Sequence, residues 1–288
     1  MEKIDFVVPY VNNQDKVWQK TFVDYAMRHD YRQVASMHGY RYEDIGLIDY
    51  QLKLVEKNMP WVNTIYLLLS NKGQEPKYIP KNCKIVYHNE FIPQKYLPTF
   101  NSTTIEMFLW NIQGLSEHFI YANDDMLPLK PLKPSDFFEN DKIKINFKEN
   151  YHLVNNALYQ YQCYNSYAHI LDKLGIIHNN KYYYPFHSFT PMIKSHCVEC
   201  FELLKDKILP NIRAFRTEEQ HNQYIYPNYE LAKYGVISST IEFNYSQLTE
   251  PHDIFQEIVK KSQILCPNVL KDKKNTAFLV QFLGELCE

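Results

Sequence analysis

Two adjacent aspartates are the first residues in this chain that could do chemistry. Asp124 and Asp125 directly follow the apolar run at 118–122. Mg²⁺ takes oxygen ligands from one or two carboxylates and completes its shell with phosphates and water, so an acidic pair at a strand end suits such an ion. An Asp-Asp pair in a turn is more commonly solvated or caps a helix, so a purely structural role is the alternative to metal binding.

Three further side chains could serve the same chemistry. Glu106 lies early in a predicted helix, where a carboxylate often caps the helix or is favoured by its dipole. His187 stands among aromatic residues, and a histidine there is more often a hydrogen-bonded core residue than a catalyst. Arg216 could pair with Glu218 or Glu219. Taken one at a time, each residue has an ordinary structural explanation.

The apolar pattern predicts a scaffold that could bring these residues together. Short apolar runs predict buried strands at 4–8, 62–69, 84–87 and 118–122. Helical patterns lie between them at 17–28, 49–58 and 103–111. Strands alternating with helices predict an α/β fold, with a Rossmann-like, mostly parallel sheet flanked by helices. Ligands bind such sheets at the carboxyl ends of the strands, so we expect the loops at 9–15 and 123–125 to face one crevice.

The pattern changes after residue 127. Residues 127–134 are rich in proline and predict an irregular crossing. Residues 135–180 are rich in Asn, Tyr and Lys with weak periodicity, and we expect a variable irregular or helical insertion that recognises the acceptor. Later helices are predicted at 191–207, 217–234 and 273–287. We expect residues 1–288 to form a single catalytic domain.

Composition excludes some classes of function. The 288 residues carry a net charge of -2, which does not suggest a nucleic-acid partner. The 24 tyrosines and 17 phenylalanines could stack on sugars, but an AT-rich genome explains them better. Cys197 and Cys200 form a lone CxxC that cannot complete a tetrahedral zinc site, so we expect both to pack in a helix. The charged N-terminus lacks a signal-peptide pattern, which predicts a cytoplasmic protein that associates with the inner face of the membrane through partners.

The combination of these segments resembles a known family. The run Leu-Pro-Thr-Phe-Asn-Ser-Thr-Thr-Ile-Glu at 97–106, with 112–125, looks like the second conserved region of the Stealth family. The other regions agree in order. Residues 4–15 resemble the first region, 187–229 the third, and 264–268 with the last helix the fourth. The family comprises bacterial capsular and exopolysaccharide phosphotransferases and includes the catalytic core of the animal GlcNAc-1-phosphotransferase.

The resemblance implies a phosphotransferase of class EC 2.7 that acts in capsule or exopolysaccharide biosynthesis. It would transfer a hexose-1-phosphate or N-acetylhexosamine-1-phosphate from a UDP-sugar to a hydroxyl of an oligosaccharide or lipid-linked glycan. Mg²⁺ or Mn²⁺ on Asp124 and Asp125 would neutralise charge on the diphosphate. His187 is the favoured base and Glu106 a ligand or orienting group, although the reverse assignment stays open. Arg216 would hold phosphate oxygens.

The same resemblance implies a set of residues that contact the donor. These are Arg41, Lys53, Asn101, Ser102 and Asn123. Of these, Arg41 is expected to act together with Arg216 on the phosphates, because a guanidinium offers a planar fork of donors.

Three departures from the family pattern qualify the resemblance. Asn12 and Val269 stand where the family usually has an acid, and Lys53 stands where it usually has an arginine. The metal would therefore have fewer carboxylates around it than in relatives. Two other functions remain open: a metal-dependent glycosyltransferase that uses a UDP-sugar, and a non-catalytic sugar-binding homologue.

Overall fold

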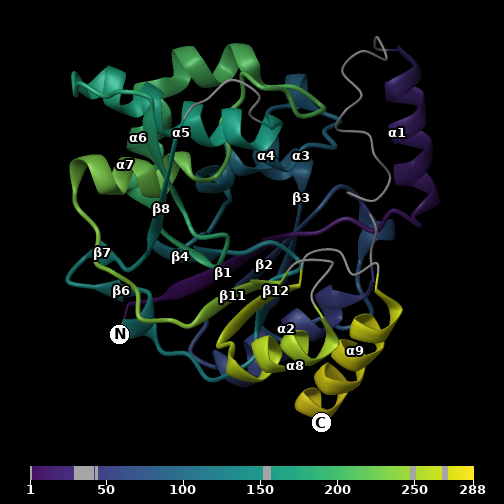
Figure 1. The fold of residues 1–288 in the computed structure, drawn as a ribbon. Helices are drawn as coiled ribbons and strands as arrows, with labels where there is room; N and C mark the ends of the chain where they lie inside the picture. Colours follow the sequence, from purple (N-terminus) through teal and green to yellow (C-terminus); the bar gives the residue numbers. More distant parts are fainter. Residues whose placement is uncertain (1, 29–41, 43–44, 152–156, 247–250, 268–271) are drawn as a thin grey trace.

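A five-stranded sheet forms the centre of the molecule (Figure 1). The computed structural model describes residues 2–28, 42, 45–151, 157–246, 251–267 and 272–288. The strand order is β10-β4-β1-β2-β3. Four strands run parallel, and these are β1 (Ile4–Pro9), β2 (Ile65–Leu69), β3 (Cys83–Tyr87) and β4 (His118–Tyr121). The edge strand β10 (Thr190–Ile193) pairs antiparallel with β4. The predicted α/β class with a mostly parallel sheet is confirmed.

Both faces of the sheet are covered, because alternate strand residues point to opposite sides. Val7 and Phe119 enter one apolar cluster, whereas Phe6 and Ile120 enter another. The first face packs against α3 (His88–Phe91), α4 (Ser102–Glu106), α6 (Lys194–Ile208) and α7 (Ile225–Lys233). The second face packs against α2 (Leu47–Asn58). Burial on both faces explains why these strands read as continuous apolar runs in the sequence.

A smaller three-stranded sheet lies next to α2. It consists of β11 (Phe243–Ser246), β12 (Ile264–Pro267) and β5 (Leu127–Pro128), in that order. Helices α8 (His252–Lys261) and α9 (Lys273–Cys287) pack beside it, and Figure 1 shows them with α2 below the central sheet. The predicted helix at 273–287 is confirmed, whereas α8 and this second sheet were not predicted.

The structure corrects two predicted helices. Residues 190–193 form β10 rather than the start of a helix, and α6 begins only at Lys194. A short apolar run fits a strand or a buried helix equally well, so its sequence cannot separate the two. The helix predicted at 217–234 begins only at Ile225, because residues 217–224 form turns held by side-chain hydrogen bonds. Helix α1 (Lys16–Arg28) agrees with its prediction.

The segment at 135–180 has more regular structure than its sequence predicted. It contains the short pair β6 (Phe138–Glu139) and β7 (Lys142–Ile143), β8 (Phe147–Tyr151) and α5 (Leu158–Leu174). Strand β8 pairs with β9 (Lys181–Pro185). Helix α5 packs against α6, α7 and β9. This segment is therefore part of the packed structure that surrounds the central sheet.

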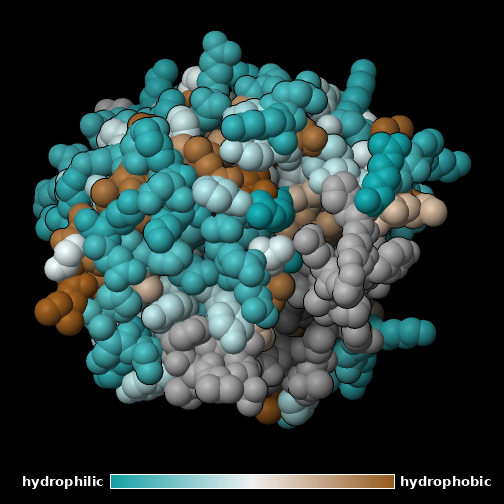
Figure 2. All heavy atoms as spheres, turned by 90° about the horizontal axis from the view of Figure 1, so that it is seen from above, coloured by the Kyte–Doolittle hydropathy of each residue, from teal (hydrophilic) through white to brown (hydrophobic). Residues whose placement is uncertain are grey.

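The surface seen from above is mainly hydrophilic, with small separate apolar patches (Figure 2). Scattered apolar residues of this kind are normal for a protein surface. Within the described ranges, no helix combines the length and the apolar character needed to cross a bilayer. Cys197 and Cys200 lie buried in α6, as predicted.

Candidate active site at the carboxyl ends of β1 and β4

The acidic turn follows β4 directly and is held by one buried amide. Gln51 of α2 is fully buried, and its Nε2 donates to the carbonyl oxygens of Asn123 and Met126 at 2.5 and 2.6 Å. Ala122 continues the ladder, because its N–H donates to Val7 O at 3.0 Å. The turn is thereby fixed at the carboxyl edge of the parallel strands, where the sequence predicted it.

Asp125 meets a histidine and a cysteine from distant parts of the chain. Its Oδ2 accepts a hydrogen bond from Cys266 Sγ of β12 at 3.5 Å. A ring nitrogen of His187 belongs to the same group, in which all ligand atoms lie within 4.8 Å of one another. The second oxygen, Oδ1, is buried and has no hydrogen-bond partner among the described residues. An open buried carboxylate oxygen beside other ligand atoms fits a divalent cation.

His187 is held from both sides. Its Nδ1 lies 2.9 Å from Tyr224 Oη, and its Nε2 lies 3.3 Å from Asn123 Nδ2. An amide nitrogen only donates, so Nε2 is the unprotonated nitrogen and Nδ1–H donates to Tyr224. Burial lowers the pKa of His187, and the opposing charge of Asp125 does not reverse that shift. The imidazole is therefore neutral at pH 7, with a lone pair on Nε2.

A second buried carboxylate lies within reach of the charge of Arg216. Glu106 is only 2% exposed. Its Oε1 accepts from Tyr121 Oη at 3.2 Å and its Oε2 from the backbone N–H of Gln223 at 2.8 Å. Burial raises the pKa of Glu106, while the charge of Arg216 opposes the rise. Arg216 Nη2 in turn donates to Ser102 Oγ at 2.5 Å.

Electrostatic effects join these two groups of residues into one site. The positive charge of Arg216 acts on the pKa of both Glu106 and His187 and lowers each of them. Burial raises the pKa of the Cys266 thiol well above its usual value, and the charges of Asp125 and Asp124 add to that rise. Charge therefore couples predicted residues that lie more than 60 positions apart in the sequence, namely Glu106 with Arg216 and Asp125 with His187.

Asn101 holds the segment that precedes Arg216. It is the N-cap of α4, and its Oδ1 accepts from Thr103 N at 3.1 Å. Its Nδ2 donates to Arg213 O at 3.1 Å and to Gln220 Oε1 at 3.0 Å. The side chain is buried and both ends of its amide are bonded. Asn101 therefore positions backbone in this structure.

Lys53, one of the predicted donor-binding residues, is not part of this arrangement. Lys53 of α2 lies with its Nζ 5.4 Å from the centre of the Tyr78 ring. Gln51, two positions earlier on α2, faces the acidic turn, and residues two apart on a helix do not share a face. The structure thus does not bring Lys53 to the cluster. Arg41 lies outside the described residues.

Asp15, the acid left in the loop after β1, serves helix α1. Its carboxylate accepts from the backbone N–H of Val17 at 3.3 Å and of Trp18 at 3.0 Å, and from Asn71 Nδ2 at 2.9 Å. These bonds lower the pKa of Asp15 despite the opposing effect of burial. The carboxylate is occupied in capping, as is that of Asp272 at the start of α9.

Several members of the site were not predicted. Cys266 is buried inside an ordinary apolar strand, and Tyr224 lies in a run of turns, so neither has a local sequence signal. Tyr121 occupies an inward position of β4 that reads as core. Only the acidic pair and the resemblance pointed to the site, since partners from distant strands and turns have no fixed spacing.

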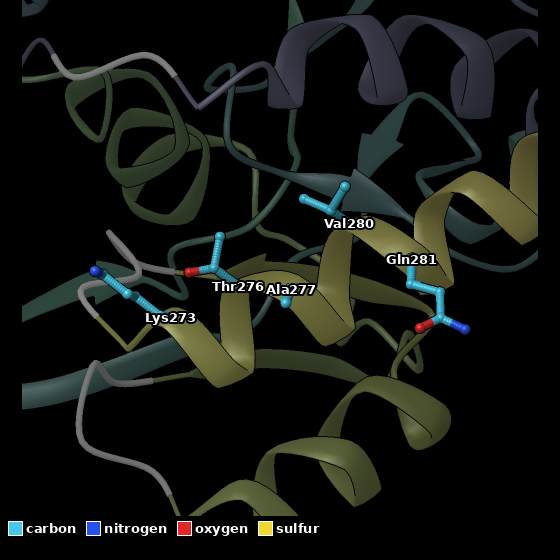
Figure 3. A pocket seen from close by; sticks show the side chains of 5 residues that line it. All are labelled: Lys273, Thr276, Ala277, Val280 and Gln281. Atoms are coloured by element: carbon cyan, nitrogen blue, oxygen red, sulfur yellow. The ribbon is translucent and has the colours of Figure 1, made fainter.

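A surface hollow elsewhere has no part in this arrangement (Figure 3). It runs along one side of α9, and its lining consists of Lys273, Thr276, Ala277, Val280 and Gln281. None of these residues was predicted to act in binding or catalysis. Side chains from a single helix, without a buried polar group among them, do not form a site.

Comparisons with known proteins connect this geometry to a family. The family model of the Stealth protein conserved region 2 matches residues 41–146, which include Glu106, Asp124 and Asp125. A capsular polysaccharide phosphotransferase of Streptococcus thermophilus is 41% identical over 145 residues, which are 49% of this chain and 60% of the relative. The match therefore spans only part of that relative.

Another relative matches over nearly the whole chain. The capsular polysaccharide phosphotransferase WcwK of Streptococcus pneumoniae is 31% identical over 305 aligned residues, covering 93% of this chain and 90% of the relative. A solved galactosyltransferase, LgtC, covers 98% of the chain with 12% identity and a TM-score of 0.45, too low to support any functional statement. On the sequence matches, the chain belongs to the Stealth family.

Proposed function

We propose that this protein transfers a sugar-1-phosphate from a nucleotide-sugar to a sugar hydroxyl in capsule synthesis. The single observation that carries the proposal is the proximity of Asp125 and His187 after β4, where the charge of Arg216 acts on both His187 and the buried Glu106. The proposal also rests on the relatives, which are named capsular polysaccharide phosphotransferases. We further propose a UDP-sugar as the donor and an oligosaccharide or lipid-linked glycan as the acceptor.

The reaction exchanges one phosphorus–oxygen bond for another. The acceptor oxygen forms a bond to the β-phosphorus of the donor, and the bond to the nucleoside monophosphate breaks. The acceptor hydroxyl loses its proton to the lone pair of His187 Nε2 and takes the place of the hydrogen bond that Asn123 Nδ2 donates to that nitrogen, while Nδ1 keeps its own proton. A positioned base contributes about 10²–10⁴-fold to a rate. The product is a sugar–phosphate–sugar diester.

The remaining residues position and neutralise charge, which is most of what phosphoryl transfer requires. Arg216 is aimed by Ser102 and lies near Glu106, and it would hold phosphate oxygens through its other N–H groups. Glu106 has both oxygens hydrogen-bonded, which favours an orienting role over that of base. Asp124 and Asp125 would hold Mg²⁺ or Mn²⁺, an ion that supplies charge neutralisation when bound.

The test is a panel of UDP- and GDP-sugars with Mg²⁺ or Mn²⁺ and a glycan acceptor. The proposal expects nucleoside monophosphate release and a phosphodiester in the product. Release of the nucleoside diphosphate with a new glycosidic bond would instead identify a glycosyltransferase. Sugar binding without turnover of any donor would identify a non-catalytic homologue.

A further inference from the structure

The neighbours of Asp125 are unusual for a magnesium site. Mg²⁺ prefers oxygen ligands, whereas imidazole and thiolate favour softer transition ions. Here the ligand atoms that lie within 4.8 Å of the carboxylate come from His187 and Cys266. The thiol reaches Asp125 Oδ2 at 3.5 Å. This set of one oxygen, one nitrogen and one sulfur is more typical of zinc than of magnesium.

The spacing of the three atoms suits such an ion. Zn²⁺ binds cysteine sulfur at about 2.3 Å and histidine nitrogen or carboxylate oxygen at about 2.0–2.2 Å, which places tetrahedral ligands roughly 3–4 Å apart. Sulfur and oxygen already lie at 3.5 Å, and no pair in the group exceeds 4.8 Å. A shift of His187 by about an ångström would complete the arrangement.

The surroundings also resemble those of a ligand histidine. A metal-binding imidazole usually donates its other N–H to an oxygen, which fixes the tautomer. His187 Nδ1–H donates to Tyr224 Oη, and Tyr224 accepts a further bond from Tyr159 at 3.1 Å. Cys266 and Tyr224 are buried, so packing holds the thiol and the hydroxyl that faces His187. The buried Oδ1 of Asp125 still has no partner in the described part of the chain.

We propose that Asp125, His187 and Cys266 form a binding site for a thiophilic divalent cation such as Zn²⁺, which overlaps the catalytic centre. Binding replaces the proton on Cys266 Sγ with a metal–sulfur bond, and the proton passes to the solvent. The cation binds Nε2 of His187, the nitrogen needed as base, and replaces the hydrogen bond that Asn123 Nδ2 donates to it. Zn²⁺ therefore inhibits the enzyme, although the binding itself does not depend on the proposed function.

Co²⁺ is the direct probe, because a thiolate ligand gives it a charge-transfer band in the near ultraviolet. The expected result is this band in the full chain and its loss in Cys266→Ser. The serine variant should weaken Zn²⁺ binding by at least about tenfold while Mg²⁺ binding changes by less than about twofold. Cys83→Ser, a half-buried thiol in β3 outside the group, is the matched control and should keep the band.

Two results would overturn the proposal. One is a wild-type protein with no thiolate band, and the other is a band that persists in Cys266→Ser. A second group, formed by exposed Glu2 and Asp141 with buried His118, could also hold a cation, but it has no sulfur and gives no thiolate band. Near-ultraviolet circular dichroism checks that the variant folds, and Cys266→Ala provides a second variant if serine disturbs β12.

An activity measurement then separates this proposal from the proposed function. With Mg²⁺ present, added Zn²⁺ should inhibit nucleoside monophosphate release in the wild type and do so about tenfold less effectively in Cys266→Ser. A thiolate band without any transferase activity would support the cation site and contradict the proposed function. Transferase activity without a thiolate band would support the proposed function and contradict the cation site.

Discussion

The acidic half and the basic half of the site are positioned in different ways. Asp124 and Asp125 follow a strand whose backbone ladder sets them at the edge of the sheet, and the single buried amide of Gln51 holds the turn from the side. Arg216 lies in turns whose backbone is held by hydrogen bonds from side chains of α5 and α4. Gln162 Nε2 donates to Thr217 O at 2.9 Å, and Thr104 Oγ1 donates to Arg213 O at 2.8 Å.

This difference teaches where substitutions should act. Backbone ladders tolerate a change of side chain, so a substitution in the acidic turn should remove chemistry and leave folding intact. A network of side-chain hydrogen bonds does not tolerate such a change, because each buried amide that loses its partner lowers the free energy of unfolding by about 1–3 kcal/mol. Variants in the turns at 213–224 should therefore change stability and activity together.

The largest effect is expected for Asp125→Asn. The change removes the charge beside the buried Oδ1 and keeps the shape of the side chain. Charge stabilisation by a bound metal is worth several kcal/mol, so kcat should fall by about 10³-fold or more. Donor turnover and the free energy of unfolding are both measured, with exposed Asp253→Asn as the control. Turnover within about tenfold of the wild type would remove Asp125 from the proposed metal site.

His187→Gln should cost about 10²–10⁴-fold in kcat, because it removes the proposed base. The pH profile sharpens this assignment. Burial lowers the pKa of His187 below its ordinary 6.5, so the base is neutral at pH 7 and is lost only as the pH falls through that lowered value. The acid limb of kcat should therefore lie below pH 6.5 in the wild type and be absent from the residual activity of the variant. An unchanged limb would assign it to another group, of which Glu106 is the first candidate.

Tyr224→Phe should have an intermediate effect of about tenfold in kcat, with KM nearly unchanged. The variant removes the hydroxyl that fixes the tautomer of His187 through Nδ1. Tyr182→Phe, another buried tyrosine of the same aromatic cluster, is the matched control. A larger change in KM than in kcat would indicate that Tyr224 shapes the donor pocket instead.

The pair His169 and His221 should make the turn region sensitive to acid. Their ring nitrogens lie 2.8 Å apart, and burial lowers the pKa of His221 from 6.5 to about 3. As the pH falls below 6.5, the unfolded chain binds a proton that the native chain does not. Stability is then lost at up to about 1.4 kcal/mol per pH unit until the native pKa is reached. His221→Gln should flatten this slope between about pH 6.5 and 5 in urea unfolding, and an identical slope would contradict the assignment.

Lys53→Ala should have the smallest effect on turnover, less than about twofold, because Lys53 lies over Tyr78 rather than at the cluster. Loss of this cation–π contact between two half-buried side chains costs about 0.5–1 kcal/mol of stability. Arg216→Lys is the comparison, since a lysine cannot replace the planar fork and should lower kcat much more. A fall in donor affinity for Lys53→Ala would restore the donor-binding role that the sequence predicted.

The central sheet was predictable because its signal is local. Buried parallel strands are continuous apolar runs, and the four predicted ones are confirmed at β1, β2, β3 and β4. The helix predicted at 103–111 is confirmed only in its first part, since α4 ends at Glu106 and a 3₁₀ turn follows at Leu109–Asn111. Asn101 caps α4, because its side chain accepts from the N–H of Thr103.

The second half was less predictable because its order comes from contacts between distant residues. Strand β10 pairs with β4 through main-chain bonds that no spacing in 190–193 encodes. Helix α5 has apolar, tyrosine and amide positions mixed on its buried side, where Gln162 and Ser166 bond to the turns at 217–222. Such a helix shows little amphipathic pattern, so its segment was predicted only as an irregular or helical insertion.

By itself, the sequence determined the class of fold, the strand-end position of Asp124 and Asp125, and the family. Those features depend on apolar runs and short motifs, which act over a few residues. Only the tertiary structure decided that Cys266 and His187 meet Asp125, and that Lys53 does not. Such meetings depend on which strands and turns pack side by side, and packing of segments more than 60 residues apart leaves no mark on local spacing.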